Sequence, residues 1–256
     1  MTLLEAIKQR HSVRRYVHKP LSADIIETLQ KKIDECNAEG GLHIQLVTNE
    51  TKAFTGIFSY GKFSGVENYL VMVGKKADDL DERVGYYGEQ LVLLAQTLGL
   101  NTCWAGLSYR KVNEAYIVGD DEKLTCMIAL GYGATQGVSH KIKKAEEVSN
   151  ICNDSPEWFR NGVEAALLAP TAINQQKFSF TLLPNEQGTR EKPKILANRG
   201  FSMVGYTKMD IGIARLHFEI GAGKENFDWA LVAGIYKTTL VSIIKKTTIE
   251  TMWTTL

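Results

Sequence analysis

The feature that most constrains the fold is an alternation of short apolar runs with helical patterns along the chain. Residues 69–73 and 124–130 are apolar runs that predict strands buried on both faces of a sheet. Between them, residues 86–98 place four apolar side chains on one stripe of a helix, which Gly99 stops. Strands that alternate with helices and long crossings predict an α+β or α/β sandwich.

Caps and periodicity predict further elements. Thr2 caps a helix over residues 2–9, and Ser22 caps a second helix that ends by Gly40-Gly41. The remaining predictions are a strand at 43–47, a polar linker or extended crossing at 137–153, a helix capped by Ser155 before Pro156, a strand at 178–183 and a helix at 209–220.

Composition limits the class of partner. Thirty basic and 29 acidic residues leave a net charge of +1, which gives no argument for nucleic acid or a membrane as the main partner. No apolar run approaches 18 residues, and the N-terminal residues do not resemble a signal peptide. The four cysteines are scattered, so we expect reduced thiols in a cytoplasmic protein. Five scattered histidines predict no metal site.

A basic segment follows the first helix. Arg10, Ser12 and Arg14 alternate, with His11 between them, so in an extended segment the three would project to one side. Arginine supplies permanently charged, fork-shaped donors and serine a neutral one, which suits a phosphate. The alternative is a set of surface charges that pair with acidic residues.

A second polar segment lies far away, at Pro170-Thr171-Ala172-Ile173-Asn174. Proline ends the preceding apolar helix, and Thr171 and Asn174 then offer donors in a tight connection. An ordinary helix stop is the alternative interpretation.

Two further segments are candidates. Ala105 and Gly106 follow a short strand-like stretch, and their small size would let a flat ring approach the main chain. Packing of Cys103 and Trp104 alone is the alternative, and Cys103 is expected to be a buried small hydrophobe. Lys141, less favourably Lys143, and also Lys62 are cations that either complete a phosphate pocket or lie in water.

These segments resemble the nitroreductase superfamily. Residues 10–14 are similar to its flavin-phosphate motif, residues 98–104 to its later helix–strand segment, and residues 130–133 to its closing strand. The family's Pro-Ser-x-x-Asn segment normally follows the second helix, where this chain has residues 36–40 instead. The match occurs at residues 170–174, in the second half.

The resemblance implies a nitroreductase-like α+β fold in a fused pseudo-dimer, of the internally duplicated "putative TM nitroreductase" type. In the family one subunit gives the basic segment and its partner gives the Pro-Ser-x-x-Asn loop. We therefore expect a first half at 1–150, a shortened second half at 151–229, an unassigned tail at 230–256, one intact and one degenerate flavin site, and a monomer that mimics a dimer.

The implied function is that of an FMN-dependent oxidoreductase. NADH or NADPH would be the donor, and nitroaromatics, quinones or free flavin the acceptors; no catalytic acid or base is required. A non-catalytic flavin carrier or sensor is the alternative. The implied cofactor-binding residues are Arg10, His11, Ser12, Arg14, Lys62, Ala105, Gly106, Lys141, Pro170, Thr171, Ala172 and Asn174.

Overall fold

The computed structural model describes residues 1–55, 62–184 and 191–230. The first half contains a four-stranded antiparallel sheet in the order β1-β2-β4-β3. Its strands are β1 (Gln45–Val47), β2 (Asn68–Lys75), β3 (Asn101–Ala105) and β4 (Glu122–Gly131). The helices of this half are α1 (Leu3–Gln9), α2 (Ala23–Gly40) and α3 (Leu80–Thr97).

The rest of the chain carries helices α4 (Ala145–Val148), α5 (Glu157–Leu167) and α6 (Thr207–Ala222), with 3₁₀ turns η1 (Ala172–Asn174) and η2 (Lys224–Asn226). Strands β5 (Phe178–Leu182), β6 (Lys194–Arg199) and β7 (Asp228–Trp229) form a second sheet in that order. Strands β5 and β6 are antiparallel, whereas β6 and β7 are parallel. Most of the expected tail, residues 231–256, lies outside the described residues.

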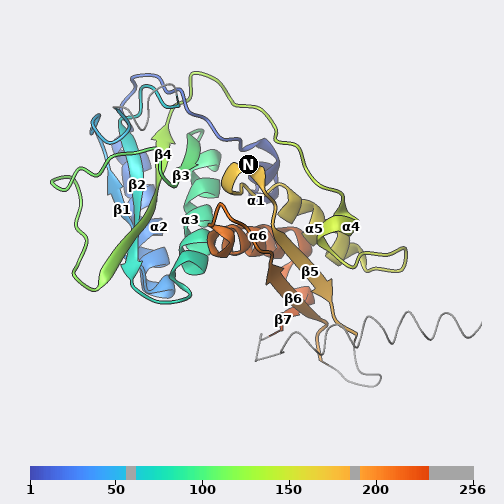
Figure 1. Cartoon of the computed structure of the whole chain (residues 1–256). Coiled ribbons are helices and arrows are strands. Elements are labelled where there is room, and N and C mark those ends of the chain that lie inside the picture. Colours follow the sequence, from blue (N-terminus) through green and yellow to red (C-terminus); the bar gives the residue numbers. More distant parts are fainter. Residues whose placement is uncertain (56–61, 185–190, 231–256) are drawn as a thin grey trace, which may run out of the picture.

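Helices α3 and α6 lie between the two sheets (Figure 1). Strand β2 has apolar contacts on both faces. Leu70 and Met72 belong to the large core that includes α3, α5 and α6, whereas Tyr69, Val71 and Val73 belong to a second core on the opposite face. Burial on both faces explains the continuous apolar run of this strand, and the strand prediction is confirmed.

Helices α3 and α6 make equivalent contacts with each other where they cross, and we call this a reciprocal crossing. A Cβ added at Gly85 would overlap the carbonyl oxygen of Met209, and a Cβ added at Gly212 would overlap that of Glu82. Gly85 and Gly212 stand 127 positions apart, as do Glu82 and Met209. Such exchange of equivalent contacts is the mark of a two-fold interface. Glycine is needed at both positions because the backbones touch there.

The helix starts partly agree with the sequence. Thr2 caps α1 as expected, because its hydroxyl accepts from the Glu5 N–H at 3.2 Å while the Glu5 carboxylate accepts from the Thr2 N–H at 2.8 Å. Helix α3 begins six residues earlier than expected, at Leu80. Helix α5 is preceded by Pro156, so Ser155 is not its cap. The segment 137–153 contains the short α4.

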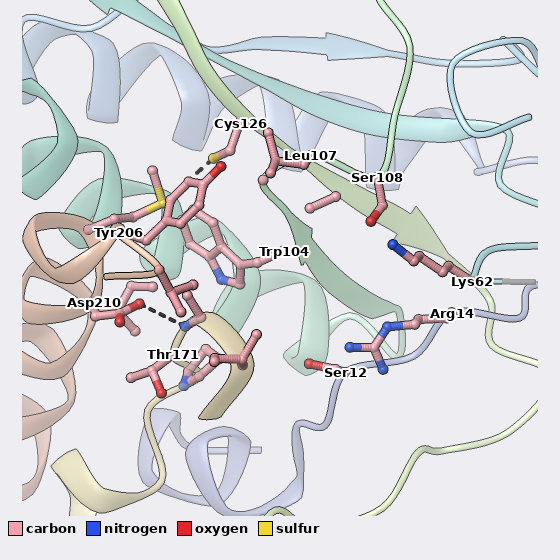
Figure 2. A pocket seen from close by; sticks show the side chains of 18 residues that line it. Ser12, Arg14, Lys62, Trp104, Leu107, Ser108, Cys126, Thr171, Tyr206 and Asp210 are labelled. Atoms are coloured by element: carbon pink, nitrogen blue, oxygen red, sulfur yellow. Dashed lines mark hydrogen bonds between the residues drawn. The ribbon is translucent and has the colours of Figure 1, made fainter. Parts of the chain in front are cut away.

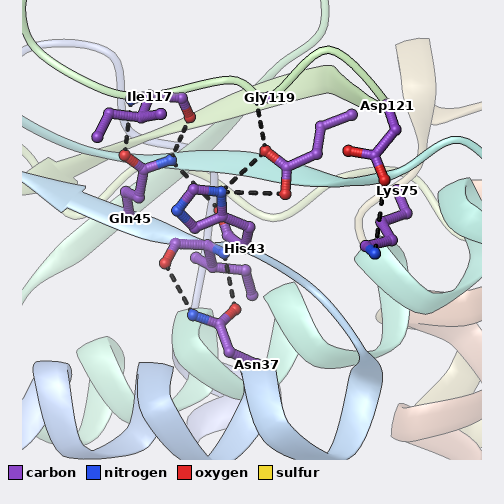
Figure 3. A network of polar contacts seen from close by, with 9 residues as sticks. Asn37, His43, Gln45, Lys75, Ile117, Gly119 and Asp121 are labelled. Atoms are coloured by element: carbon purple, nitrogen blue, oxygen red, sulfur yellow. Dashed lines mark hydrogen bonds and ion pairs between the residues drawn. The ribbon is translucent and has the colours of Figure 1, made fainter.

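A polar network joins the loop before β1 to the start of β4 (Figure 3). The His43 ring lies 2.9 Å from a Glu122 carboxylate oxygen, and the same carboxylate accepts from the Gly119 N–H at 2.8 Å. Burial raises the pKa of Glu122, but these two hydrogen bonds outweigh it and leave that pKa below its ordinary value. Among the described residues, no helix is long and apolar enough to cross a membrane.

Candidate cofactor site

A cavity of about 320 Å³ lies between the two halves of the chain (Figure 2). This volume falls within the usual range for a small-molecule pocket. Half of its lining comes from residues 12–126 and half from residues 170–213. The lining residues are Ser12, Arg14, Lys62, Trp104, Ala105, Gly106, Leu107, Ser108, Cys126, Pro170, Thr171, Ala172, Ile173, Val204, Tyr206, Met209, Asp210 and Ile213.

Backbone pairing places the basic segment at the cavity. The Val13 N–H donates to the Thr102 carbonyl at 3.0 Å, so the segment runs beside β3. On its other side, the Ser64 N–H donates to the Arg14 carbonyl at 3.0 Å, which brings the neighbouring Lys62 to the same cavity. Figure 2 shows Arg14, Lys62 and Ser12 together on one side of the open space.

The opposite side is a rigid loop after α5. Ile173, Asn174 and Gln176 all have positive φ angles, of 48°, 58° and 45°. Such angles are uncommon without glycine, so surrounding contacts must hold the loop. The Asp210 carboxylate supplies two of them, accepting from the Ala172 N–H at 2.9 Å and from the Gln175 side-chain amide at 2.6 Å.

Asp210 is an acid in an apolar wall. Its exposure is 2%, and burial raises the pKa of its carboxyl to about 6, although the hydrogen bonds from Ala172 and Gln175 act in the opposite direction. The Cys126 thiol also lines the cavity, and burial raises its pKa to about 12. That thiol is therefore protonated at neutral pH and unreactive.

A glycine and two aromatic side chains shape the wall. A Cβ added at Gly106 would lie 2.6 Å from the Tyr206 ring, so a larger residue there would require that ring to shift. A Cβ added at Gly88 of α3 would likewise lie 2.6 Å from the Trp104 indole. The indole N–H donates to the Glu89 carboxylate at 2.9 Å. The expected packing of Trp104 and its role as a cavity wall therefore coexist.

The structure places Arg10 away from the cavity lining. Arg10 follows the last residue of α1, and its N–H donates to the Ala6 carbonyl. The alternation predicted that Arg10 projects to the same side as Ser12 and Arg14. This prediction is wrong, because Arg10 lies at the end of α1 and Ser12 and Arg14 alone line the cavity. Its side chain is 5% exposed and lies 3.9 Å from the Glu89 carboxylate. Among the described residues, its Nε and Nη1 have no hydrogen-bond partner.

Four other candidate residues do not line the cavity. His11 is half-buried. It precedes Ser12 in the sequence, but it does not line the cavity. The Asn174 amide donates to the Lys141 carbonyl at 2.7 Å, so this side chain closes the loop internally, and the Lys141 side chain is exposed. The Lys143 ammonium donates to the Gln176 carbonyl at 2.7 Å. These residues connect the crossing segment to the loop.

Several lining residues were not predicted from the sequence. They are Trp104, Leu107, Ser108, Cys126, Ile173, Val204, Tyr206, Met209, Asp210 and Ile213. For Asp210 a signal existed, because an acid between the apolar Met209 and Ile211 of a predicted helix is a candidate for a buried functional group. The others required knowledge of how the halves pack.

A second cavity, of about 410 Å³, lies at the same helix crossing. Its α3 residues Glu82, Arg83 and Tyr86 stand 127 positions before Met209, Asp210 and Ile213 of the first cavity, so the two cavities are related by the reciprocal crossing. Here large side chains interact across the space. They are Arg215, whose guanidinium lies 4.6 Å from the Trp229 ring centre, and Glu219, which accepts from Trp229 at 2.6 Å and from Tyr86 at 2.5 Å.

Comparison with known families agrees with this architecture. The family model described as "Putative TM nitroreductase" matches residues 2–222. The chain belongs to this family. Membership supports a general oxidoreductase role and the nitroreductase fold. Among curated proteins, none matches this sequence.

A solved structure shows the same fold. A putative nitroreductase from Thermotoga maritima is 22% identical, with a TM-score of 0.59, and the match covers 91% of this chain and 90% of that one. A putative nitroreductase from Desulfovibrio desulfuricans, solved in complex with FMN, is 16% identical, with a TM-score of 0.46, over 61% of this chain and 98% of that one.

Proposed function

We propose that this member of the nitroreductase family binds FMN in the cavity between its halves and uses NADH or NADPH to reduce nitroaromatic, quinone or flavin acceptors. The observation that carries the proposal is the meeting of Ser12, Arg14 and Lys62 with residues 170–173 around one cavity. These are the two segments that the family resemblance assigns to opposite sides of a flavin.

The residues present fit an anionic cofactor. Buried N–H groups in native proteins nearly always have partners, yet two guanidinium nitrogens of Arg10 have none among the described residues. A phosphate bound near Ser12, two residues along the chain, would supply acceptors for them. Arg14 and Lys62 add positive charge at the cavity itself.

When bound, FMN supplies the redox chemistry, and the protein supplies binding, orientation and electrostatics. Ser12, Arg14 and Lys62 would hold the phosphate and pyrimidine ends. Ala105 and Gly106 contribute backbone to the wall, and the Pro170–Ile173 loop, fixed by Asp210, would cover the opposite face and exclude water.

We also propose that the chain is a monomer in which two halves, roughly 1–150 and 151–229, take the place of two subunits. The reciprocal crossing at Gly85 and Gly212 supports this arrangement. Since the lining of the related cavity includes neither Ser12, Arg14 and Lys62 nor residues 170–173, we expect one FMN per chain. Sedimentation that gives an obligate dimer would argue against the monomer.

Spectroscopy and one pair of variants test the proposal. The purified protein mixed with FMN should give a bound-flavin spectrum that bleaches on anaerobic addition of NADH or NADPH and recovers on addition of menadione. Arg14→Ala should weaken FMN binding by about 10-fold to 100-fold, the equivalent of one charged hydrogen bond. Arg15→Ala, the exposed neighbour outside the cavity, should leave binding unchanged.

Each outcome has a definite meaning. Equal FMN affinities for the two variants would refute the site, and absence of any flavin binding would refute the function. Binding without turnover with either nicotinamide would instead favour the carrier or sensor.

A further inference from the structure

A charged cluster is buried behind the cavity wall, where α1, α3, β3 and α6 meet. Glu89 of α3 lies at its centre and is 0% exposed. One carboxylate oxygen accepts from the Trp104 indole N–H at 2.9 Å. The other lies 3.0 Å from His217 Nε2 and 3.9 Å from Arg10 Nε. A buried carboxylate is retained only where several donors compensate its lost hydration.

The hydrogen bonds define how many protons the cluster holds. His217 Nδ1 lies 3.2 Å from the Ala165 carbonyl, which only accepts, so Nδ1 carries a hydrogen. Nε2 faces Glu89, so one further proton lies between Nε2 and the carboxylate. Whichever atom carries it, the Glu89–His217 pair is neutral. Arg10 therefore leaves the cluster with a net charge of +1, entirely inside the protein.

Each partner of Glu89 belongs to a segment that borders the cavity. Trp104 lines the cavity directly and is followed by Ala105 and Gly106. Arg10 lies two residues before Ser12, which lines the cavity. His217 holds the carbonyl of Ala165 in α5, the helix that leads into the loop at Pro170. A single buried acid therefore connects three sides of the site.

The cluster occurs on one side of the helix crossing only. The position of α6 equivalent to Glu89, 127 residues later, is Leu216, which belongs to a small apolar cluster with Ala6, Ile7 and Leu93. The buried acid at the second cavity is Glu219, which stands at a different position of α6 and accepts from Trp229 and Tyr86. The arrangement of Glu89 with Arg10, Trp104 and His217 is therefore particular to the side of the first cavity.

We propose that Glu89 is a positioning residue for the cofactor. It holds the Arg10 guanidinium buried, with two nitrogens unpaired, two residues before Ser12 of the cavity lining, and it fixes the Trp104 wall through the indole N–H. This inference rests on the proposed function, because the anionic group is taken to be the FMN phosphate.

Glu89→Gln separates position from charge. The glutamine oxygen can still accept from Trp104, and its amide can donate to a His217 that is protonated on Nδ1 alone, so the hydrogen bonds survive. The net charge of the cluster stays +1. Only the oxygen that lies 3.9 Å from Arg10 Nε is replaced, by an amide nitrogen that cannot accept from the guanidinium. We expect FMN affinity, measured by quenching of flavin fluorescence, to fall on the order of tenfold. Affinity for riboflavin, which lacks the phosphate, should not change.

Two further variants complete the test. Trp104→Phe removes the indole N–H and should weaken FMN and riboflavin by similar factors, because both carry the ring. Tyr86→Phe removes a comparable hydrogen bond, to Glu219 in the second cavity, and should lower the melting temperature while leaving both affinities unchanged.

The inference is overturned if Glu89→Gln leaves FMN affinity unchanged, or if it weakens riboflavin as much as FMN. It is also overturned if Tyr86→Phe weakens FMN equally, since the effect would then reflect general stability. A wild-type chain that binds riboflavin and FMN equally well would overturn the role of Arg10 while sparing the cavity. Binding of neither flavin would overturn the proposed function itself.

Discussion

Asp210 is expected to make the stability of the protein fall as the pH rises through the weakly acidic range. Its pKa rises from an ordinary 3.8 to about 6 in the folded chain, chiefly because the carboxyl is buried. Between these values the folded chain holds a proton that the unfolded chain has released. The folded state therefore loses stability with increasing pH, and the loss is complete above about pH 6.

The magnitude follows from the same values. A rise from 3.8 to about 6 corresponds to about 3 kcal/mol in the free energy of unfolding. About 2 kcal/mol of this should be lost between pH 4.5 and pH 7.5, because the unfolded carboxyl is already mostly ionised at pH 4.5. Asp210→Asn removes the titration while the amide oxygen can still accept from the Ala172 N–H.

Urea unfolding of both proteins at several pH values, without flavin, measures the effect. The wild type should lose about 2 kcal/mol relative to Asp210→Asn across this range. Asp121, an exposed acid 3.4 Å from the Lys75 ammonium, provides the control (Figure 3). Asp121→Asn should differ from the wild type by a pH-independent amount within about 0.5 kcal/mol. A flat or rising difference for Asp210→Asn would refute the argument.

Three further predictions follow from packing. Gly85→Ala should destabilise the fold by about 3 kcal/mol or more in urea unfolding, since its Cβ meets backbone of α6, whereas Gly200→Ala has only ordinary contacts and should cost less than about 1 kcal/mol. Gly106→Ala should displace the Tyr206 ring and weaken FMN by on the order of tenfold in a titration; unchanged affinity would remove the ring from this wall. Cys152, exposed and with a pKa lowered by the Ser155 hydroxyl, should be the first thiol labelled by a disulfide reagent at neutral pH, and equal labelling of Cys126 would contradict its burial.

Local signals predicted the elements of this fold well. The apolar run at 69–73 became β2 because both of its faces are covered, and Thr2 capped α1 as its spacing with Glu5 indicated. The start of α3 was placed late because the acidic residues before Tyr86 admit either a loop or a first helical turn. Ser155 failed as a cap because Pro156 takes that position in the structure.

The site was less accessible from the sequence. Ser12 and Arg14 were found because their chemistry and alternation are local, whereas the position of Arg10 depends on where α1 ends. Asp210 and Glu89 gain their roles only when α6 packs against α3, a contact between residues more than a hundred positions apart. No local pattern contains that information.

The reciprocal crossing of α3 and α6 also sets a schedule for biosynthesis. Gly212, in the helix that must cover Gly85, leaves the ribosome 127 residues after Gly85 does. At common rates of translation this delay is about 6–25 s. During that interval the face of α3 around Gly85 is not yet covered by α6. We therefore expect this interval to be the stage of synthesis at which chaperones are most needed.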